Sequence, residues 1–205
     1  GEASFISGDE IIIDDEIITG KQIVIATGAT PVIPEIDGLS KVSYHTSDTI
    51  MRIAELPKRL GIIGGGYIAV ELAHVFSSFG CEVTMLVRGN TLISKEDLSI
   101  RERFNKVFQE KVDLRFEATV SKVRQGSNGI RLNFEDETLD VLEVDELLLA
   151  TGRLPDLDSL KIRAANIATT DGYIVTDQYM RTTADNIWAL GDVTNPAQLK
   201  HTANV

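Results

Sequence analysis

The sequence predicts an α/β fold with a parallel sheet, and three observations indicate it. An apolar run at residues 60–63 ends in glycines and passes directly into a segment with helical periodicity. A second apolar run follows at residues 83–87, so the order is strand, helix, strand. Two more apolar strands are expected within residues 23–28 and 147–152, and each ends in Ala-Thr-Gly. A strand, a helix and a strand in this order form a βαβ unit, whose strands run parallel.

The glycines between the first strand and the helix match the fingerprint of a Rossmann-like dinucleotide-binding unit. Gly64 permits a tight turn, and Gly66 lets the backbone approach a pyrophosphate. Ala69 is the third small residue, which keeps the helix close to the sheet. The free N–H groups and the positive end of the helix dipole would then face the phosphates. The alternative is a glycine turn that only packs a helix on a sheet.

Three helices are expected from the spacing of apolar residues. On the helix after Gly66, the apolar stripe is Ile68, Leu72, Val75, Phe76 and Phe79. A second helix is expected at residues 95–111, with Ser94 and Asp97 as its capping box. Its expected buried stripe is Leu98, Phe104, Val107 and Phe108. A third helix is expected at residues 47–56.

The remaining segments are expected to be strands and loops. Residues 1–29 predict short strands, and residues 113–149 change to an alternation of apolar and polar positions, typical of an antiparallel meander. Short strands are also expected at residues 173–175 and 187–190. The two Ala-Thr-Gly strand ends bracket the βαβ unit, which suggests one domain inserted into another. A chance resemblance between two buried strands is the alternative.

Composition narrows the class of partner. The net charge of −11 argues against general binding to nucleic acids or acidic membranes. Apolar runs fall short of the roughly 18–20 residues that cross a bilayer, so no membrane partner is expected. Cys81 is the single cysteine, so no internal disulfide can form, which predicts a reducing, cytoplasmic compartment. We expect Cys81 to be a buried structural thiol, and the scattered histidines predict no metal site.

Taken together, the motifs resemble the two-dinucleotide-domain flavoprotein disulfide reductases. This family includes glutathione reductase, dihydrolipoamide dehydrogenase, mercuric reductase and mycothione reductase. The matching motifs stand in family order at residues 26–28, 64–71, 150–153 and 187–192. The strongest likeness is to mycothione reductase, through residues 47–52, 73–77, 101–104 and 199–204.

The resemblance implies a division of the chain and a role for it. Residues 1–29 would be the tail of an FAD-domain segment, and residues 30–150 an NAD(P)H-binding domain. Residues 151–205 would return to the FAD and central regions. Hydride would pass from NADPH to FAD, and electrons then to a small-molecule disulfide. The family's amino-terminal FAD fingerprint, paired redox cysteines and dimerisation domain are not in this sequence, so we expect the middle of a longer, homodimeric enzyme, inactive alone.

Several residues take expected roles from this resemblance. Arg88 ends the second strand, where an acidic residue would hold the ribose of NADH, and an arginine instead suits the 2′-phosphate of NADPH. A solvated surface arginine is the alternative. Glutathione reductases often use a second arginine where Ser94 stands here, so use of NADH stays open.

Tyr67 is expected to be a gate over the flavin ring, and Glu71 the partner of a lysine beside the flavin. Packing for the tyrosine and plain solvent exposure for the glutamate are the alternatives. Asp192 resembles the aspartate that binds the FAD ribityl chain. Gly28, Gly152 and Arg153 are expected to bind cofactor as members of the matching motifs, and the segment around His201 would approach the flavin.

Two other functions compete with an NADPH-linked disulfide reductase. An NAD-linked dihydrolipoamide dehydrogenase is the nearer one, and Arg88 argues against it. A stand-alone nucleotide-binding or redox-sensing module is the other. The Gly191-Asp192 motif argues against that module, because only an FAD site would need it.

Overall fold

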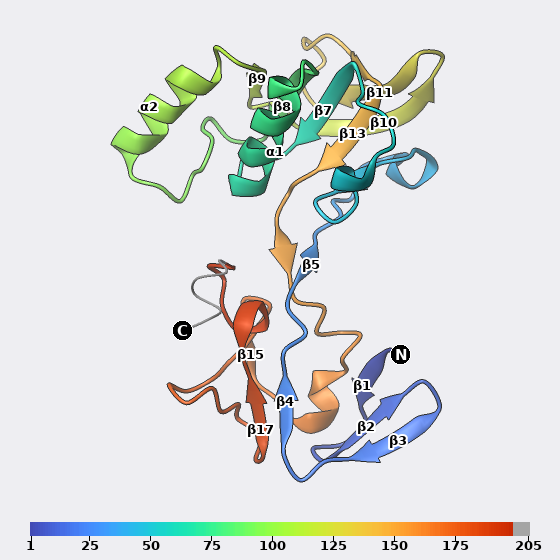
Figure 1. Cartoon of the computed structure of the whole chain (residues 1–205), viewed down its shortest axis with the longest axis vertical. Helices are drawn as coiled ribbons and strands as arrows, with labels where there is room; N and C mark the ends of the chain where they lie inside the picture. The colour runs from blue at the N-terminus through green and yellow to red at the C-terminus, as the bar shows by residue number, and fades with distance from the viewer. Residues whose placement is uncertain (199–205) are drawn as a thin grey trace. The chain divides into compact units, whose positions relative to one another are not determined.

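The computed structural model describes residues 1–198, which fall into two compact units (Figure 1). Among the described residues, unit 1 combines residues 1–30 with residues 153–198, and unit 2 is residues 31–152. The chain passes from one unit to the other shortly after each of the two Ala-Thr-Gly sequences. That unit 1 is part of an FAD domain stays a prediction.

Unit 2 is built on a five-stranded sheet in the order β6-β13-β7-β8-β9, in which all neighbours run parallel. The strands are β6 (His45–Thr46), β13 (Glu146–Leu149), β7 (Arg59–Ile63), β8 (Glu82–Val87) and β9 (Asp113–Phe116). The predicted α/β class with a parallel sheet is therefore confirmed. β9 contradicts the prediction that residues from 113 onward begin the antiparallel meander, because it pairs in parallel with β8.

Both faces of this sheet are covered. Leu148 of β13 packs in the cluster on the helical side, together with α1 (Tyr67–Ser78). Leu147 and Leu149 pack on the opposite side against an antiparallel meander of β10 (Val120–Gly126), β11 (Gly129–Phe134) and β12 (Leu142–Val144). A strand buried on both sides is apolar at consecutive positions, which explains the unbroken apolar run.

The buried face of α1 differs from the predicted stripe. Ala69, Val70, Ala73 and Phe76 are the buried residues, whereas Phe79 caps the helix and is 70% exposed. The buried face is turned from the prediction by about one residue around the helix axis. Small side chains lie against the sheet because they allow the helix to approach it closely, and the larger apolar ones flank them.

The second helix, α2 (Leu98–Phe108), is shorter than predicted and has a different cap. The carboxylate of Asp97 accepts the Ser99 N–H at 2.9 Å, so Asp97, and not Ser94, is the N-cap. Leu98 is 59% exposed and Val107 is 39% exposed, which contradicts their predicted burial. Phe104 and Phe108 face the core and stack with ring centres 5.0 Å apart.

The helix predicted at residues 47–56 is wrong. Only a 3₁₀ turn, η2 (Ile50–Arg52), forms there, and a similar turn, η1 (Leu39–Lys41), precedes β6. The Thr49 hydroxyl accepts the Thr46 N–H at 3.0 Å, and the Thr46 hydroxyl accepts the Asp48 N–H at 3.3 Å. These bonds pair N–H groups that the first turn of any helix leaves unsatisfied, and the chain returns to an extended conformation at Ile53, directly after the 3₁₀ turn.

Unit 1 contains small sheets around its own core. Its elements are β1 (Ala3–Phe5), β2 (Glu10–Ile13), β3 (Glu16–Thr19), β4 (Ile23–Ile25), β15 (Thr169–Thr170), β16 (Tyr173–Ile174), β17 (Ile187–Ala189) and the 3₁₀ turns η3 (Ile162–Ala165) and η4 (Gly191–Val193). β4 and β17 pair in parallel, and β1, β2 and β3 form an antiparallel sheet. β5 (Thr30–Pro31) pairs with β14 (Arg153–Leu154). None of the helices within residues 1–198 is long and apolar enough to cross a membrane.

Cys81 lies at the start of β8 and is 6% exposed, so its predicted burial is confirmed. Burial raises the pKa of the Cys81 thiol to about 11, and the charge of Asp145 adds to the rise. The thiol is therefore protonated at neutral pH, which makes it a poor nucleophile.

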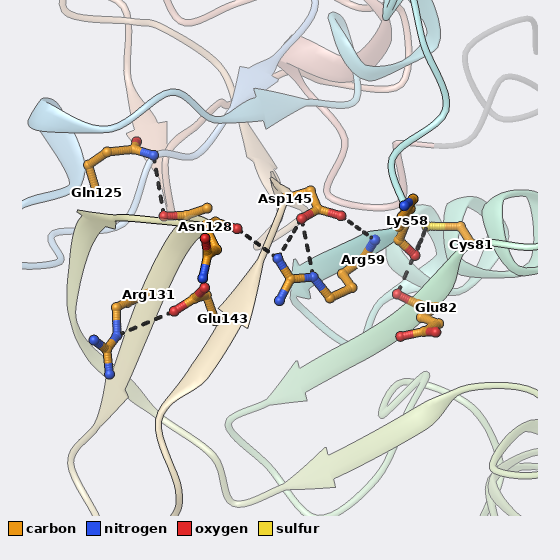
Figure 2. A network of polar contacts seen from close by, with 10 residues as sticks. Lys58, Arg59, Cys81, Glu82, Gln125, Asn128, Arg131, Glu143 and Asp145 are labelled. Carbon is orange, nitrogen blue, oxygen red and sulfur yellow. Dashed lines mark hydrogen bonds and ion pairs between the residues drawn. The ribbon is translucent and has the colours of Figure 1, made fainter.

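An ion pair at the amino ends of β7 and β13 joins two parts of unit 2 (Figure 2). Arg59 Nη2 and Nε donate to Asp145 Oδ1 at 2.6 and 3.1 Å, and the Arg59 peptide N–H donates to Asp145 Oδ2 at 2.8 Å. Arg59 Nη2 also donates to the Asn128 carbonyl, at 2.7 Å, at the tip of the β10–β11 hairpin. One arginine therefore joins the parallel sheet to the meander.

We predict that Asp145→Ala lowers the free energy of unfolding by about 1–2 kcal/mol, after allowance for solvent screening, because the two side chains are 34% and 32% exposed. The bond from Arg59 lowers the pKa of Asp145 from its ordinary value of 3.8. The pair should therefore stabilise the fold fully above that value and lose its effect as the pH falls through the lowered native pKa. Urea unfolding at several pH values measures this. The exposed control Asp140→Asn should change little; an equal loss in both variants would contradict the prediction.

Candidate functional site

The carboxyl ends of the parallel strands meet at one edge of the unit 2 sheet. Gly64 follows β7 directly, and Arg88 follows β8 directly. Because β7 and β8 are paired neighbours, these two residues lie at the same edge. This is the edge at which open α/β sheets bind their ligands.

Gly64 is required by the approach of a neighbouring strand. Its φ of 139° lies in a region that other residues rarely adopt. A Cβ atom at this position would stand 2.2 Å from the carbonyl oxygen of Ala150, the residue after β13. The Gly64 N–H donates to the Leu86 carbonyl at 3.0 Å, which draws the turn against β8.

Gly66 differs, because neither its conformation nor its packing demands glycine. It is the N-cap of α1, with an extended backbone of φ −84° and ψ −175°. Within residues 1–198, no atom apart from its chain neighbours lies within 4 Å of the place where its Cβ would stand. This open space leaves room for a phosphate to approach the amides of the first helical turn.

Ala69 and Ala73 are both fully buried on the face of α1 that meets the sheet. Their small side chains bring the helix axis close to the strands, as the fingerprint requires. Tyr67 and Glu71, four residues apart, share another face of α1, and both are exposed. Tyr67 is 41% exposed, whereas its role and that of Glu71 stay predictions.

The Tyr67 hydroxyl donates a hydrogen bond to Glu96 Oε1, in the loop between β8 and α2. This bond raises the pKa of the Tyr67 phenol above its ordinary value. Sequence reasoning missed Glu96, since it lies 29 residues from Tyr67 and belongs to no motif. Only the fold brings the two together.

The loop that carries Glu96 is tied to the glycine turn. The Ile93 N–H donates to the Gly65 carbonyl at 2.7 Å, and the Leu92 N–H donates to Asn105 Oδ1 at 3.1 Å. A Cβ at Gly65 would lie 2.8 Å from Val87 Cγ1, so the turn also packs closely on β8. Arg88 opens this loop with an exposed side chain.

In unit 1, the parallel pairing of β4 and β17 brings Gly28 and Asp192 to the same strand ends. The Leu190 N–H donates to the Ile25 carbonyl at 3.0 Å, just before this edge. Burial raises the pKa of Tyr173, and the charge of Asp192 adds to the rise. Asp192 therefore lies near that phenol.

The motif at residues 150–153 takes part in local backbone contacts. Arg153 Nη2 donates to the Ala29 carbonyl at 2.5 Å, so part of its guanidinium holds the chain after β4. Gly152 has a φ of 123°, which favours glycine there. His201 lies outside the described residues. A surface hollow of about 530 Å³ is lined by residues between 155 and 172, and the predicted site residues are not among those described as lining it.

Comparison with known proteins agrees with this geometry. The family model described as "Pyridine nucleotide-disulphide oxidoreductase" matches residues 3–204. The chain belongs to this family. Its relatives are flavin-dependent enzymes that use NAD(P)H, and the enzyme class follows from the family. The recognition made from the sequence motifs is confirmed.

Individual relatives share more than a third of their aligned residues with the chain. Mycothione reductase from Mycobacterium tuberculosis is 44% identical over 189 residues, which cover 92% of this chain and 41% of the relative. Mercuric reductase from Staphylococcus aureus is 37% identical over 206 residues, covering 99% and 38%.

The solved structure of the HOCl-induced flavoprotein disulfide reductase RclA from Escherichia coli matches with a TM-score of 0.90 and 36% identity. This match covers 99% of the chain and 47% of that structure. The chain thus spans less than half the length of these relatives.

The two glycines should respond differently to substitution. Gly64→Ala should lower the free energy of unfolding by more than about 1 kcal/mol, because a side chain there is strained and meets the Ala150 carbonyl. Gly66→Ala should leave stability within about 0.5 kcal/mol of the parent and weaken dinucleotide binding. Urea unfolding and calorimetric titration with NADPH measure the two effects. If Gly66→Ala bound NADPH with unchanged affinity, the assignment of the phosphate to this turn would be wrong.

Proposed function

We propose that this chain binds NADPH within a longer, FAD-dependent disulfide reductase similar to mycothione reductase. The proposed preference for NADPH over NADH rests on Arg88. It follows β8 directly, at the sheet edge that holds the glycine turn, and its side chain is exposed to a ligand. An arginine there pairs with a 2′-phosphate, whereas the acidic residue typical of NAD sites would repel it.

The rest of the dinucleotide would follow α1. The pyrophosphate would lie on the amides after Gly66, where a Cβ would otherwise stand. Tyr67 and Glu71, on one exposed face of the same helix, would then line the nicotinamide side, with Tyr67 as gate. Water exclusion by the tyrosine ring is what such a gate contributes.

FAD would be held by the strand ends of unit 1. Gly28 and Asp192 stand at one edge of the β4–β17 pair, so a carboxylate and a glycine with a φ of 67° are available to a polyhydroxyl chain. Gly152 and Arg153 are proposed to complete the contacts to cofactor. When bound, FAD accepts hydride from the nicotinamide and passes electrons to a disulfide.

The substrate is proposed to be a small-molecule disulfide, as the name of the relative mycothione reductase suggests. A homodimer in the cytoplasm is part of the same proposal, and the single cysteine, which allows no internal disulfide, supports a reducing compartment. NADH is the second candidate cofactor. Ser94, which stands where a second phosphate-binding arginine is often found, favours it.

The cofactor preference is measurable on this chain. NADPH should bind more tightly than NADH by about 1.5–3 kcal/mol, roughly ten- to a hundredfold, because the phosphate contact is charge-assisted. Arg88→Glu should reverse the order. Calorimetry with both nucleotides tests this, and Arg124→Glu makes the same charge change on an exposed residue of β10 as a control. Equal affinities that Arg88→Glu leaves unchanged would rule out the assignment.

A further inference from the structure

The ring of Tyr67 is oriented by a polar contact more than by packing. Tyr67 is the first residue of α1 and is 41% exposed, so few neighbours confine it. Its hydroxyl donates to the Glu96 carboxylate, a charged acceptor on another segment. The raised pKa of the phenol has this bond as its largest cause. A hydrogen bond to an ionised acceptor is stronger than one between neutral groups.

The position of Glu96 is fixed independently of Tyr67. The Glu96 N–H donates to the Ile93 carbonyl at 2.9 Å, and the Ile93 N–H donates to the Gly65 carbonyl at 2.7 Å. Ile93 is 7% exposed and has a φ of 42°, which is costly for a β-branched residue. Such a conformation persists only where the surroundings fix it, and it is most common at functional sites.

Two contacts join the glycine turn and the start of α1 to the loop after β8. Gly65 lies in the turn, and Tyr67 is the first residue of α1. Ile93 and Glu96 both lie in the loop after β8. The backbone contact between Ile93 and Gly65 sets the loop in place. The side-chain contact between Glu96 and Tyr67 then determines where the Tyr67 ring lies.

We propose that Glu96 is a positioning residue for the gate: its carboxylate holds the Tyr67 ring at the loop after β8 and thereby opposes binding of the nicotinamide end of NADPH. This role rests on the proposed function. When the nicotinamide binds, the ring turns aside and its hydroxyl leaves Glu96. Because this hydrogen bond must be broken before the nicotinamide can bind, its presence lowers the apparent affinity for NADPH.

A comparison of ligands with and without the nicotinamide distinguishes this role from a general effect on the site. A nucleotide without it, 2′,5′-ADP, contacts Arg88 but leaves the ring in place. Removal of the hydrogen bond should therefore tighten NADPH binding and leave 2′,5′-ADP binding unchanged. Glu96→Gln keeps an acceptor without the charge, so its affinity for NADPH should lie between those of the parent and Glu96→Ala.

The experiment is calorimetry of both nucleotides on the full chain and its variants. Glu96→Ala and Tyr67→Phe should each tighten NADPH binding about threefold or more, with 2′,5′-ADP unchanged. The double variant should show no further increase in affinity, since both changes break one hydrogen bond. Glu102→Ala, an exposed acid of α2, is the matched control and should change neither affinity.

A spectroscopic readout separates positioning from loss of folding. With tyrosine labelled at ¹³Cζ, the Tyr67 signal, assigned through Tyr67→Phe, should titrate at lower pH in Glu96→Ala than in the parent. Adding NADPH to the parent should cause the same shift, and 2′,5′-ADP should not. If Glu96→Ala leaves this titration unchanged, or alters both affinities equally, the role of Glu96 is overturned while the proposed function stands. If the parent binds neither nucleotide, the proposed function is overturned, and the role of Glu96 with it.

Discussion

The approach of the Ala150 carbonyl to Gly64 is the constraint on which the site depends. A Cβ at Gly64 would stand 2.2 Å from that oxygen, so only glycine lets β7 and β13 end side by side. The chain can then turn sharply and begin α1 at Tyr67, within a few residues of the strand. The amides of the first helical turn thereby come to the sheet edge where β8 delivers Arg88.

The same edge has a second layer, formed by the loop after β8. Ile93 is bonded to the Gly65 carbonyl, which brings Glu96 to the hydroxyl of Tyr67. At the opposite ends of the strands, Arg59 joins Asp145 and the hairpin tip at Asn128. The sheet is thus fixed at its amino ends by an ion pair, and at its carboxyl ends by backbone contacts that leave Arg88 exposed.

Each wrong prediction has a physical cause of its own. Apolar spacing finds that a segment is a strand, but alternation does not encode strand direction, so β9 was assigned to the meander and lies in the parallel sheet. On α1 the spacing selected the largest apolar residues, while the sheet accepts Ala69 and Ala73 because close packing needs small side chains. At residues 47–56 the apolar spacing does not reveal that the chain becomes extended at Ile53, after a single 3₁₀ turn.

The βαβ unit, the glycine turn and the family can be recognised in the sequence, because they depend on local backbone demands and on motifs with fixed spacing. Gly64, Gly66 and Arg88 were identifiable for that reason. The contacts of Glu96 with Tyr67 and of Asp145 with Arg59 arise only in the folded chain, since both pairs join segments far apart in the sequence. Pairings of that kind arise from how strands and loops pack, and no local pattern of residues encodes them.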